Sequence, residues 1–326
     1  MEFISQIRKP IEADMERYRV IFDSYLDHSD PLLCEVFKAI SNRKGKMMRP
    51  MLTLLVAKML GGNIGDKSLY TAATFEYFHT ASLVHDDIVD ESEERRGQES
   101  VNCAYGNKVA VLVGDYLLAN ALKCAWQAGS MRLVDIVSTA AQNLASGEIL
   151  QLDNVNNHSV SEEVYFNIIK NKTAALFSAC AEAGALSVSA DETDAMRMRL
   201  LGEYIGICFQ IRDDIFDYNS DAAIGKPTGN DMKEGKITLP AIHALLSTGD
   251  ALMLDYAKKI KLGVATQSMM IDALVSFTKA NGGIEYAVEI MNDYALKAKN
   301  LLQHYPESDS KRSIIYYIDY AIKRSL

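Results

Sequence analysis

The absence of proline over a long stretch constrains the fold most. The chain has six prolines, and none lies between Pro50 and Pro227. Proline is the strongest helix breaker, and this stretch is rich in Ala, Leu, Met, Glu and Lys, which favour helices. Alternating strand patterns are hard to find, and glycines and polar clusters divide the chain into segments of helical length. We therefore expect an all-α protein, a single-domain bundle of helices over residues 1–326.

The composition excludes several classes of protein. Of 326 residues, 48% are hydrophobic and 24% are charged, which is ordinary for a globular protein. A formal net charge of -9 argues against general nucleic-acid binding, which needs a basic face. The five scattered cysteines form no C-x-x-C pair and are expected as free thiols. The N-terminus shows no signal-peptide core, so we expect a cytoplasmic protein.

The longest apolar stretch does not predict a membrane span. It runs from Val109 to Trp126 and is interrupted by Asp115, Asn120 and Lys123. A continuous apolar run of about 20 residues is typical of a membrane helix. We therefore expect a buried helix here and no membrane span.

Two aspartate clusters share the spacing D-D-x-x-D. They are Asp86, Asp87 and Asp90, and Asp213, Asp214 and Asp217. Residues four apart share one face of a helix, where like charges repel by about 0.2–0.5 kcal/mol per pair. One such cluster could be a solvated acidic helix end. Two clusters in apolar sequence predict a pair of hard-cation sites, and oxygen ligands suit Mg²⁺.

Each cluster ends a predicted helix. The segment from Leu69 to Asp90 should be one helix. One face of this helix carries Phe75, His79, Ser82, Asp86 and Asp90. A second stripe comprises Gly202, Gly206, Gln210, Asp213 and Asp217. Glycine inside a helix costs about 1 kcal/mol, so the two glycines predict close helix packing or, less commonly, space for a ligand.

Basic residues near these clusters could bind an anion. They are Lys46 and Arg49, Arg95 and Arg96, Lys172 beside Thr173, and Lys226 and Lys236 within an expected loop from Gly225 to Lys236. Guanidinium and ammonium groups beside a metal site can bind phosphate oxygens. The alternatives are ion pairs with neighbouring glutamates, solvated loops and, for His79, a satisfied core histidine. The glycine-rich phosphate loops of nucleotide-binding folds are absent.

Together these motifs resemble the trans-isoprenyl diphosphate synthases, also called polyprenyl synthetases. The matching elements are G-K-M-M-R-P at Gly45–Pro50, H-T-A-S-L-V-H-D-D-I-V-D at His79–Asp90, Arg95-Arg96-Gly97, Lys172-Thr173, F-Q-I-R-D-D-I-F-D at Phe209–Asp217, and G-K-I-T-L-P at Gly235–Pro240. They occur in the family's order, and the resemblance covers about residues 30 to 325.

The resemblance implies a fold, a reaction and metal ligands. The family fold is an all-α bundle around a deep central cavity, usually a homodimer. The implied reaction transfers an allylic prenyl group, head to tail, onto isopentenyl diphosphate. It uses Mg²⁺, with three ions expected between the two facing clusters. The metal ligands would be Asp86, Asp90, Asp213 and Asp217, with Asp87 and Asp214 also catalytic, directly or through water.

The resemblance also assigns the substrate-binding residues. Those expected to bind the allylic diphosphate are Arg95, Lys172, Lys226 and Lys236, joined by Gln210. Those expected to bind isopentenyl diphosphate are Gly45, Lys46, Arg49, His79 and Arg96. Oxygens of Thr173 and Gln210 would stabilise the developing cation.

Small residues before the first cluster predict a medium-to-long product. Ala81 and Ser82 lie about one turn before Asp86, where short-chain members of the family often place a bulky residue. Phe75 lies about 16 Å from Asp86 along the helix, above which three or more isoprene units could fit. We expect an octaprenyl-like product, such as the side chain of a quinone. The alternatives are a geranylgeranyl or farnesyl diphosphate synthase, a class I terpene cyclase, and a non-catalytic partner subunit, which commonly has one cluster degraded.

Overall fold

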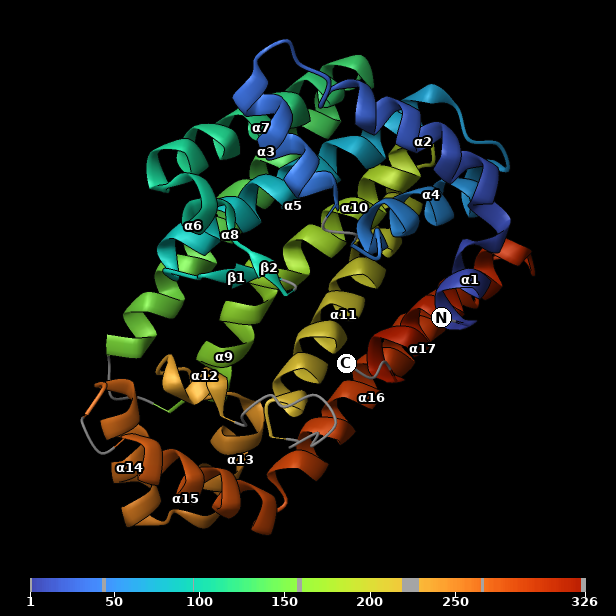
Figure 1. Cartoon of the computed structure of the whole chain (residues 1–326). Coiled ribbons are helices and arrows are strands. Elements are labelled where there is room, and N and C mark those ends of the chain that lie inside the picture. The colour runs from blue at the N-terminus through green and yellow to red at the C-terminus, as the bar shows by residue number, and fades with distance from the viewer. Residues whose placement is uncertain are drawn as a thin grey trace. The chain divides into compact units, whose positions relative to one another are not determined.

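Figure 1 shows the computed structural model of the chain, which describes residues 2–42, 45–95, 97–156, 160–218, 229–264 and 267–323. Within these ranges nearly every element is a helix, and the only strands are β1 (Glu94–Arg95) and β2 (Gln98–Glu99), which form an antiparallel pair. The expected all-α class is therefore confirmed.

The chain divides into two compact units. The first comprises Met1–Thr139, Ala179–Arg199 and Tyr305–Tyr317, and the second comprises Ala140–Ser178, Leu200–His304 and Ile318–Leu326. The helices with residues in both units are α8 (Met131–Asn156), α10 (Ala175–Ser187), α11 (Glu192–Phe216) and α17 (Asp309–Lys323). That the two units act as one domain stays a prediction.

The first unit is built around α5. Its helices are α1 (Glu2–Arg8), the 3-10 helix η1 (Lys9–Ile11), α2 (Glu12–Ser24), α3 (Pro31–Asn42), α4 (Met48–Gly61), α5 (Asp66–Val89), α6 (Val101–Tyr105) and α7 (Asn107–Gln127). Helix α5 packs against α2, α4 and α6, and most extensively against α7. It begins at Asp66 rather than at the expected Leu69, because Gly65 is extended and an acidic residue suits the positive end of the helix dipole.

Helix α7 is a core helix of this unit. It is the one helix in the described part of the chain that is long and apolar enough to cross a membrane. A Cβ atom at Gly114 would overlap with the imidazole of His85 on α5, so the two helices cross closely. One side of α7 buries Val113, Leu117 and Ala121. The sequence predicts a buried helix here, and the structure buries one side of it; the absence of a membrane span stays a prediction.

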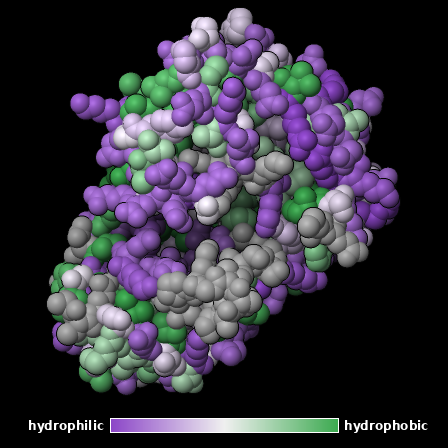
Figure 2. Space-filling model, viewed as in Figure 1, coloured by the Kyte–Doolittle hydropathy of each residue, from purple (hydrophilic) through white to green (hydrophobic). Residues whose placement is uncertain are grey.

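The second unit contains shorter helices. They are α9 (Glu162–Ile169), the π-helix η2 (Lys170–Ala174), α12 (Asn230–Lys233), α13 (Leu239–Thr248), α14 (Ala251–Lys261), α15 (Gln267–Ala280) and α16 (Gly283–Leu302). In Figure 1, α14 and α15 lie side by side, and α13 packs against α15 and α16. On the face shown in Figure 2, hydrophilic residues predominate and hydrophobic residues are scattered among them.

Glycines let α8 and α11 approach η2 closely. A Cβ atom at Gly147 of α8 would lie 2.7 Å from the backbone nitrogen of Lys172. One at Gly206 of α11 would lie 2.5 Å from Cα of Ala174, and Gly202 packs against α10 in the same way. Real Cβ atoms do not come this close to a backbone. The close packing predicted for Gly202 and Gly206 is therefore confirmed.

Candidate active site

The first aspartate cluster lies at the C-terminal end of α5. Asp87 is buried (1% exposed), Asp86 is half-buried and Asp90 is exposed. Arg95 of β1 donates a hydrogen bond from Nε to Oδ1 of Asp87 and forms an ion pair with it. Asn102 of α6 donates to the backbone carbonyl of Asp87 at 3.2 Å. The hairpin and α6 thus hold the end of α5, and the buried carboxylate has the partner that its burial requires.

A cavity of about 70 Å³ in the first unit gathers three of the predicted binding residues. They are Gly45, His79 and Arg95. Glu76, which the sequence motifs did not single out, also lines the cavity, as does Asp87. Its apolar lining includes Phe22, Ile40, Leu83 and Val84. The cavity therefore offers polar groups to a charged ligand and an apolar wall to a short hydrocarbon chain.

Two of the predicted cations near this cavity do not line it. Lys46 and Arg49, both within the described ranges, are absent from its lining. Arg96 lies outside the described residues. Met47, between Lys46 and α4, has a φ of 51°, in the left-handed region that residues other than glycine rarely adopt. Glu91, directly after the first cluster, has a φ of 50°. Such strained backbone is common at functional sites.

The second aspartate cluster lies at the C-terminal end of α11. Asp214 is buried (2% exposed), and both of its carboxylate oxygens accept hydrogen bonds. Oδ2 accepts one from the Tyr165 hydroxyl at 2.6 Å, and Oδ1 accepts one from Nε2 of Gln210 at 2.9 Å. Asp213 and Asp217 are half-buried. In both clusters, then, the middle aspartate is buried and bound within its own unit, whereas the outer two are more exposed.

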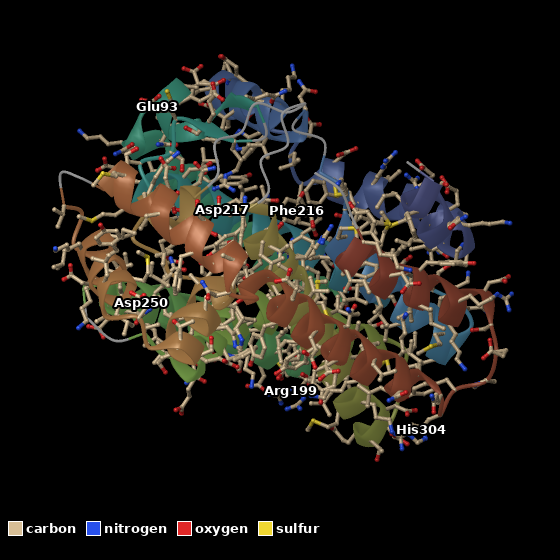
Figure 3. The ribbon with its side chains drawn as sticks, turned by 90° about the horizontal axis from the view of Figure 1, so that it is seen from below. Glu93, Arg199, Phe216, Asp217, Asp250 and His304 are labelled. Carbon is tan, nitrogen blue, oxygen red and sulfur yellow. The ribbon has the colours of Figure 1, made fainter. Side chains whose placement is uncertain are left out.

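Asp217 also organises the segment around α12. Its Oδ1 and Oδ2 atoms accept hydrogen bonds from the backbone N–H groups of Asn230 at 2.8 Å and Asp231 at 3.1 Å. Figure 3 labels Asp217 beside Phe216 at the end of α11. A carboxylate that satisfies such N–H groups stabilises a helix start. The segment from Gly225 to Lys236, expected as a loop, therefore contains the short helix α12, and the expectation was wrong at this point.

Lys172 and Thr173 lie in the π-helix η2, between the close approaches of α8 and α11. The ammonium group of Lys172 is 2.5 Å from Oε2 of Glu148 and 3.4 Å from Oε1 of Gln151, both on α8. The hydroxyl of Thr173 donates to Oε1 of Gln210 on α11 at 2.8 Å. Turns of π-helix are frequent at functional sites because they redirect side chains out of the helical register.

A cavity of about 140 Å³ in the second unit gathers most of the predicted residues of this region. They are Lys172, Thr173, Gln210, Asp214 and Lys236. Its other lining residues are Gln151, Asn154, Val155, Tyr165, Ile168, Ile169, Asp231, Ile237 and Thr238. The ammonium group of Lys236 is 2.5 Å from Oε2 of Glu234. Lys226 lies outside the described residues.

Carboxyl groups around this cavity have raised pKa values. Burial, opposed by the hydrogen bonds from Tyr165 and Gln210 and reinforced by the charges of Asp213 and Asp217, raises the pKa of Asp214 to about 7. Burial, and then the charges of Asp214 and Asp217, raise the pKa of Asp231 to about 8. Burial likewise raises the pKa of Asp217. The negative charge here is incompletely compensated, which suits a site for a cation.

Sequence patterns alone missed four residues of this site: Tyr165, Glu148, Gln151 and Asp231. Tyr165 lies seven residues before Lys172, about two helical turns, so a shared helix face was an available signal. Glu148 and Gln151 belong to another helix, and nothing local pairs them with Lys172. Asp231 was hidden in the segment expected as a loop, and its burial accompanies the capping by Asp217.

No complete metal site is formed within either unit by the residues that the structure describes. Among them, no three His, Cys, Asp or Glu side chains are grouped so as to hold an ion. The first cluster belongs to the first unit and the second cluster to the second unit. That the clusters face each other and share metal ions stays a prediction.

Comparisons with known proteins agree with the motifs. The profile of the family described as Polyprenyl synthetase matches residues 30–267. Octaprenyl diphosphate synthase of Haemophilus influenzae is 34% identical over 313 residues, which cover 96% of this chain and 94% of that protein. Geranylgeranyl pyrophosphate synthase of Bacteroides thetaiotaomicron is 49% identical, with a TM-score of 0.86 over 99% of this chain and 100% of that one.

A third relative carries ligands. The polyprenyl synthase of Caulobacter crescentus, whose structure is complexed with calcium and isoprenyl diphosphate, is 31% identical, with a TM-score of 0.90 over 98% of each chain. These proteins match nearly the whole chain, and the family profile spans both aspartate clusters. The resemblance carried by the motifs is confirmed, and the chain belongs to the polyprenyl synthetase family.

Proposed function

We propose that the protein condenses an allylic diphosphate with isopentenyl diphosphate, head to tail, to give an all-trans polyprenyl diphosphate. As a member of the polyprenyl synthetase family, it is a prenyltransferase. The cavity of the second unit carries the proposal. There Lys172, a cation for a phosphate, lies beside the oxygens of Thr173 and Gln210 and beside the second cluster. This combination suits a reaction in which a diphosphate leaves and positive charge develops on carbon.

In this proposal, residues of both units bind the allylic diphosphate, and residues of the first unit bind isopentenyl diphosphate. The allylic diphosphate is bound by Arg95, Lys172, Lys226 and Lys236. Isopentenyl diphosphate is bound by Gly45, Lys46, Arg49, His79 and Arg96. The cavity of the first unit supports the second assignment, because it combines Gly45 and His79 with an apolar wall.

Three polar side chains of the second cavity, those of Lys172, Thr173 and Gln210, take part in the proposed chemistry. Lys172 neutralises part of the charge of the leaving diphosphate as the allylic carbon–oxygen bond breaks, and the electron pair leaves with the diphosphate. Oxygens of Thr173 and Gln210 stabilise the allylic cation. The isopentenyl double bond then forms the new carbon–carbon bond, and a proton passes to the released diphosphate. The apolar side chains of Ile168 and Ile169 help to exclude water, which would quench the cation.

Three Mg²⁺ ions complete the proposed site. Their protein ligands would be Asp86, Asp90, Asp213 and Asp217, all oxygen donors of the kind that Mg²⁺ prefers. The raised pKa of Asp217, caused by burial, fits this assignment because it marks negative charge that a cation would stabilise. When bound, the ions would supply the positive charge that makes diphosphate a good leaving group. The calcium in the Caulobacter crescentus protein is a cation of the same hard, oxygen-binding class.

We propose a medium-to-long, octaprenyl-like product. Ala81 and Ser82 are small and buried, and they precede Asp86 by about one turn. The 49% identity with a geranylgeranyl pyrophosphate synthase favours a second candidate, a geranylgeranyl diphosphate synthase. Incubation of the protein with farnesyl diphosphate, labelled isopentenyl diphosphate and Mg²⁺, followed by chromatography, separates them. Products longer than geranylgeranyl diphosphate support the octaprenyl-like proposal. Geranylgeranyl diphosphate as the final product supports the second candidate. If the folded protein alone performs no condensation, both are contradicted and a partner subunit is indicated.

A homodimer in the cytoplasm is part of this proposal. Val111, Leu112, Leu122 and Trp126 of α7 are 42%, 68%, 55% and 75% exposed. At 100° per residue they fall on one stripe of the helix, interrupted by the exposed Asp115 and away from the side that the helix buries. A second copy of the chain would cover this apolar stripe.

A further inference from the structure

Tyr165 is a buried residue of the second cavity to which none of the predicted roles extends. It lies on α9, is 6% exposed, and donates its hydroxyl proton to Oδ2 of Asp214 at 2.6 Å. Burial, and then the charge of Asp214, raise the pKa of Tyr165 well above its ordinary value, so the hydroxyl keeps the proton that it donates. Because a buried carboxylate requires hydrogen-bond donors, this contact holds Asp214 in place.

The position of Asp214 decides the orientation of the Gln210 amide. Gln210 can offer either its NH₂ group or its oxygen to a neighbour, and above its pKa of about 7 Asp214 is ionised and only accepts. The NH₂ group therefore faces Asp214 at 2.9 Å. The amide oxygen is then directed to Thr173, whose hydroxyl donates to it at 2.8 Å.

This orientation in turn decides what Thr173 can do. A threonine hydroxyl has one proton and two lone pairs. With its proton given to Gln210, both lone pairs of Thr173 remain available in the cavity that Thr173 and Lys172 line. A flipped amide would instead donate to Thr173 and occupy a lone pair. The hydroxyl proton could then point into the cavity, where it would repel positive charge.

We propose that Tyr165 is a positioning residue, which acts through Asp214 and Gln210 to keep the oxygen lone pairs of Thr173 directed at the developing allylic cation. This inference rests on the proposed function, since it assumes that a cation forms in this cavity. Oriented dipoles of this kind stabilise charge without reorganising during the reaction.

The variant Tyr165→Phe tests the proposal because it removes a single oxygen atom. We expect kcat for one condensation to fall about five- to tenfold, the effect of one lost hydrogen bond, with KM for both substrates unchanged. Tyr305→Phe is the matched control: it removes a hydroxyl that donates to a different carboxylate, that of Asp194, at 2.7 Å. It should leave kcat unchanged. A wild-type protein that does not condense the substrates contradicts the proposed function, whereas a wild-type kcat in Tyr165→Phe overturns this inference alone.

A double-mutant cycle shows whether Tyr165 acts through Thr173. Thr173→Val removes the hydroxyl at nearly constant shape. If the hydrogen-bond chain transmits the effect, Tyr165→Phe should lower kcat no further in the Thr173→Val background. Independent, additive losses would overturn the proposal. Thermal melts establish that each variant is folded, and if Tyr165→Phe does not fold, Tyr165→Leu, which also removes the hydroxyl, takes its place in the cycle with the same expected non-additivity.

Discussion

At the scale of single residues, the two aspartate clusters use their members differently. Asp87 is bound by Arg95, and Asp214 by Tyr165 and Gln210. A carboxylate with such partners stabilises its own unit and orients its neighbours. The outer aspartates are more exposed, and Asp217 among them accepts hydrogen bonds from the backbone N–H groups of Asn230 and Asp231. In the proposed function the outer aspartates bind the metal ions, and the buried middle aspartates are held by side chains of their own unit.

The ionisation of Asp231 predicts that the thermal stability of the metal-free protein depends on pH. Its pKa is raised to about 8 by burial and by Asp214 and Asp217, from about 3.9 in an unfolded chain. Protonation thus favours the folded state, and this contribution to stability is lost as the pH rises from about 4 to about 8. In EDTA, Tm should fall between pH 5 and pH 8, and by less in Asp231→Asn than in the wild type. Asp272→Asn, an exposed change on α15, should behave as the wild type. Equal pH dependence of all three proteins would contradict this assignment.

At the scale of elements, close helix packing sets the geometry of the second cavity. Because α8 packs closely at Gly147, Glu148 and Gln151 can contact the ammonium group of Lys172. Because α11 packs closely at Gly206, Gln210 can accept the hydrogen bond from Thr173. The side-chain contacts of the site thus depend on two glycines that have no side chain to offer a ligand.

The variant Gly206→Ala should loosen this geometry. Its new Cβ atom would lie 2.5 Å from Cα of Ala174, so a backbone must move. We expect the free energy of unfolding to fall by about 1–3 kcal/mol, as for other overpacked cores, and kcat to fall with it. Gly65→Ala is the control, because no heavy atom lies within 4 Å of a Cβ atom there. Urea unfolding and steady-state assays measure both effects, and a wild-type stability of Gly206→Ala would contradict the packing argument.

Helix α5 should also set the product length. Replacing Ala81 or Ser82 by Phe adds bulk about one turn before Asp86, and we expect shorter products from a protein that still performs the first condensation. Chromatography of labelled products measures the change, and thermal melts check that each variant folds, since both positions are buried. An unchanged product distribution from the folded variants would show that the growing chain does not pass these residues.

At the scale of the whole molecule, the proposed reaction needs both units, because Gly45 and His79 belong to the first and Lys172 and Lys236 to the second. The apolar stripe of α7 further predicts association of two copies. Trp126→Asp should change the mass in solution from a dimer to the 36.1 kDa monomer, because burying an unpaired charge is costly. Leu296→Asp, on α16 and 58% exposed, is the control and should leave the dimer intact. Light scattering measures the mass, and a dimeric Trp126→Asp variant would remove α7 from the interface.

Sequence patterns predicted the helices better than the contacts between them. Local signals, which are residue spacing and helix-breaking residues within one segment, were enough for three features. These are the helix that carries Asp86, the helix that ends near Asp217 and the close packing at Gly206. The partners of Lys172 do not, because Glu148 lies on a helix that packing alone brings near. Helix α12 was missed for a similar reason: its start depends on the carboxylate of Asp217 rather than on local residue preferences.

The π-helix η2 has a consequence for the length of this segment. A π turn accommodates one residue more than an α turn. Deleting Asn171 would let an ordinary α-helix run through and rotate the residues before the deletion relative to the residues after it. The side chain of Tyr165 would then be rotated by about 100° around the helix axis relative to Thr173. Here the number of residues matters as well as their identity, so the loss of a single position should be tolerated worse than most substitutions.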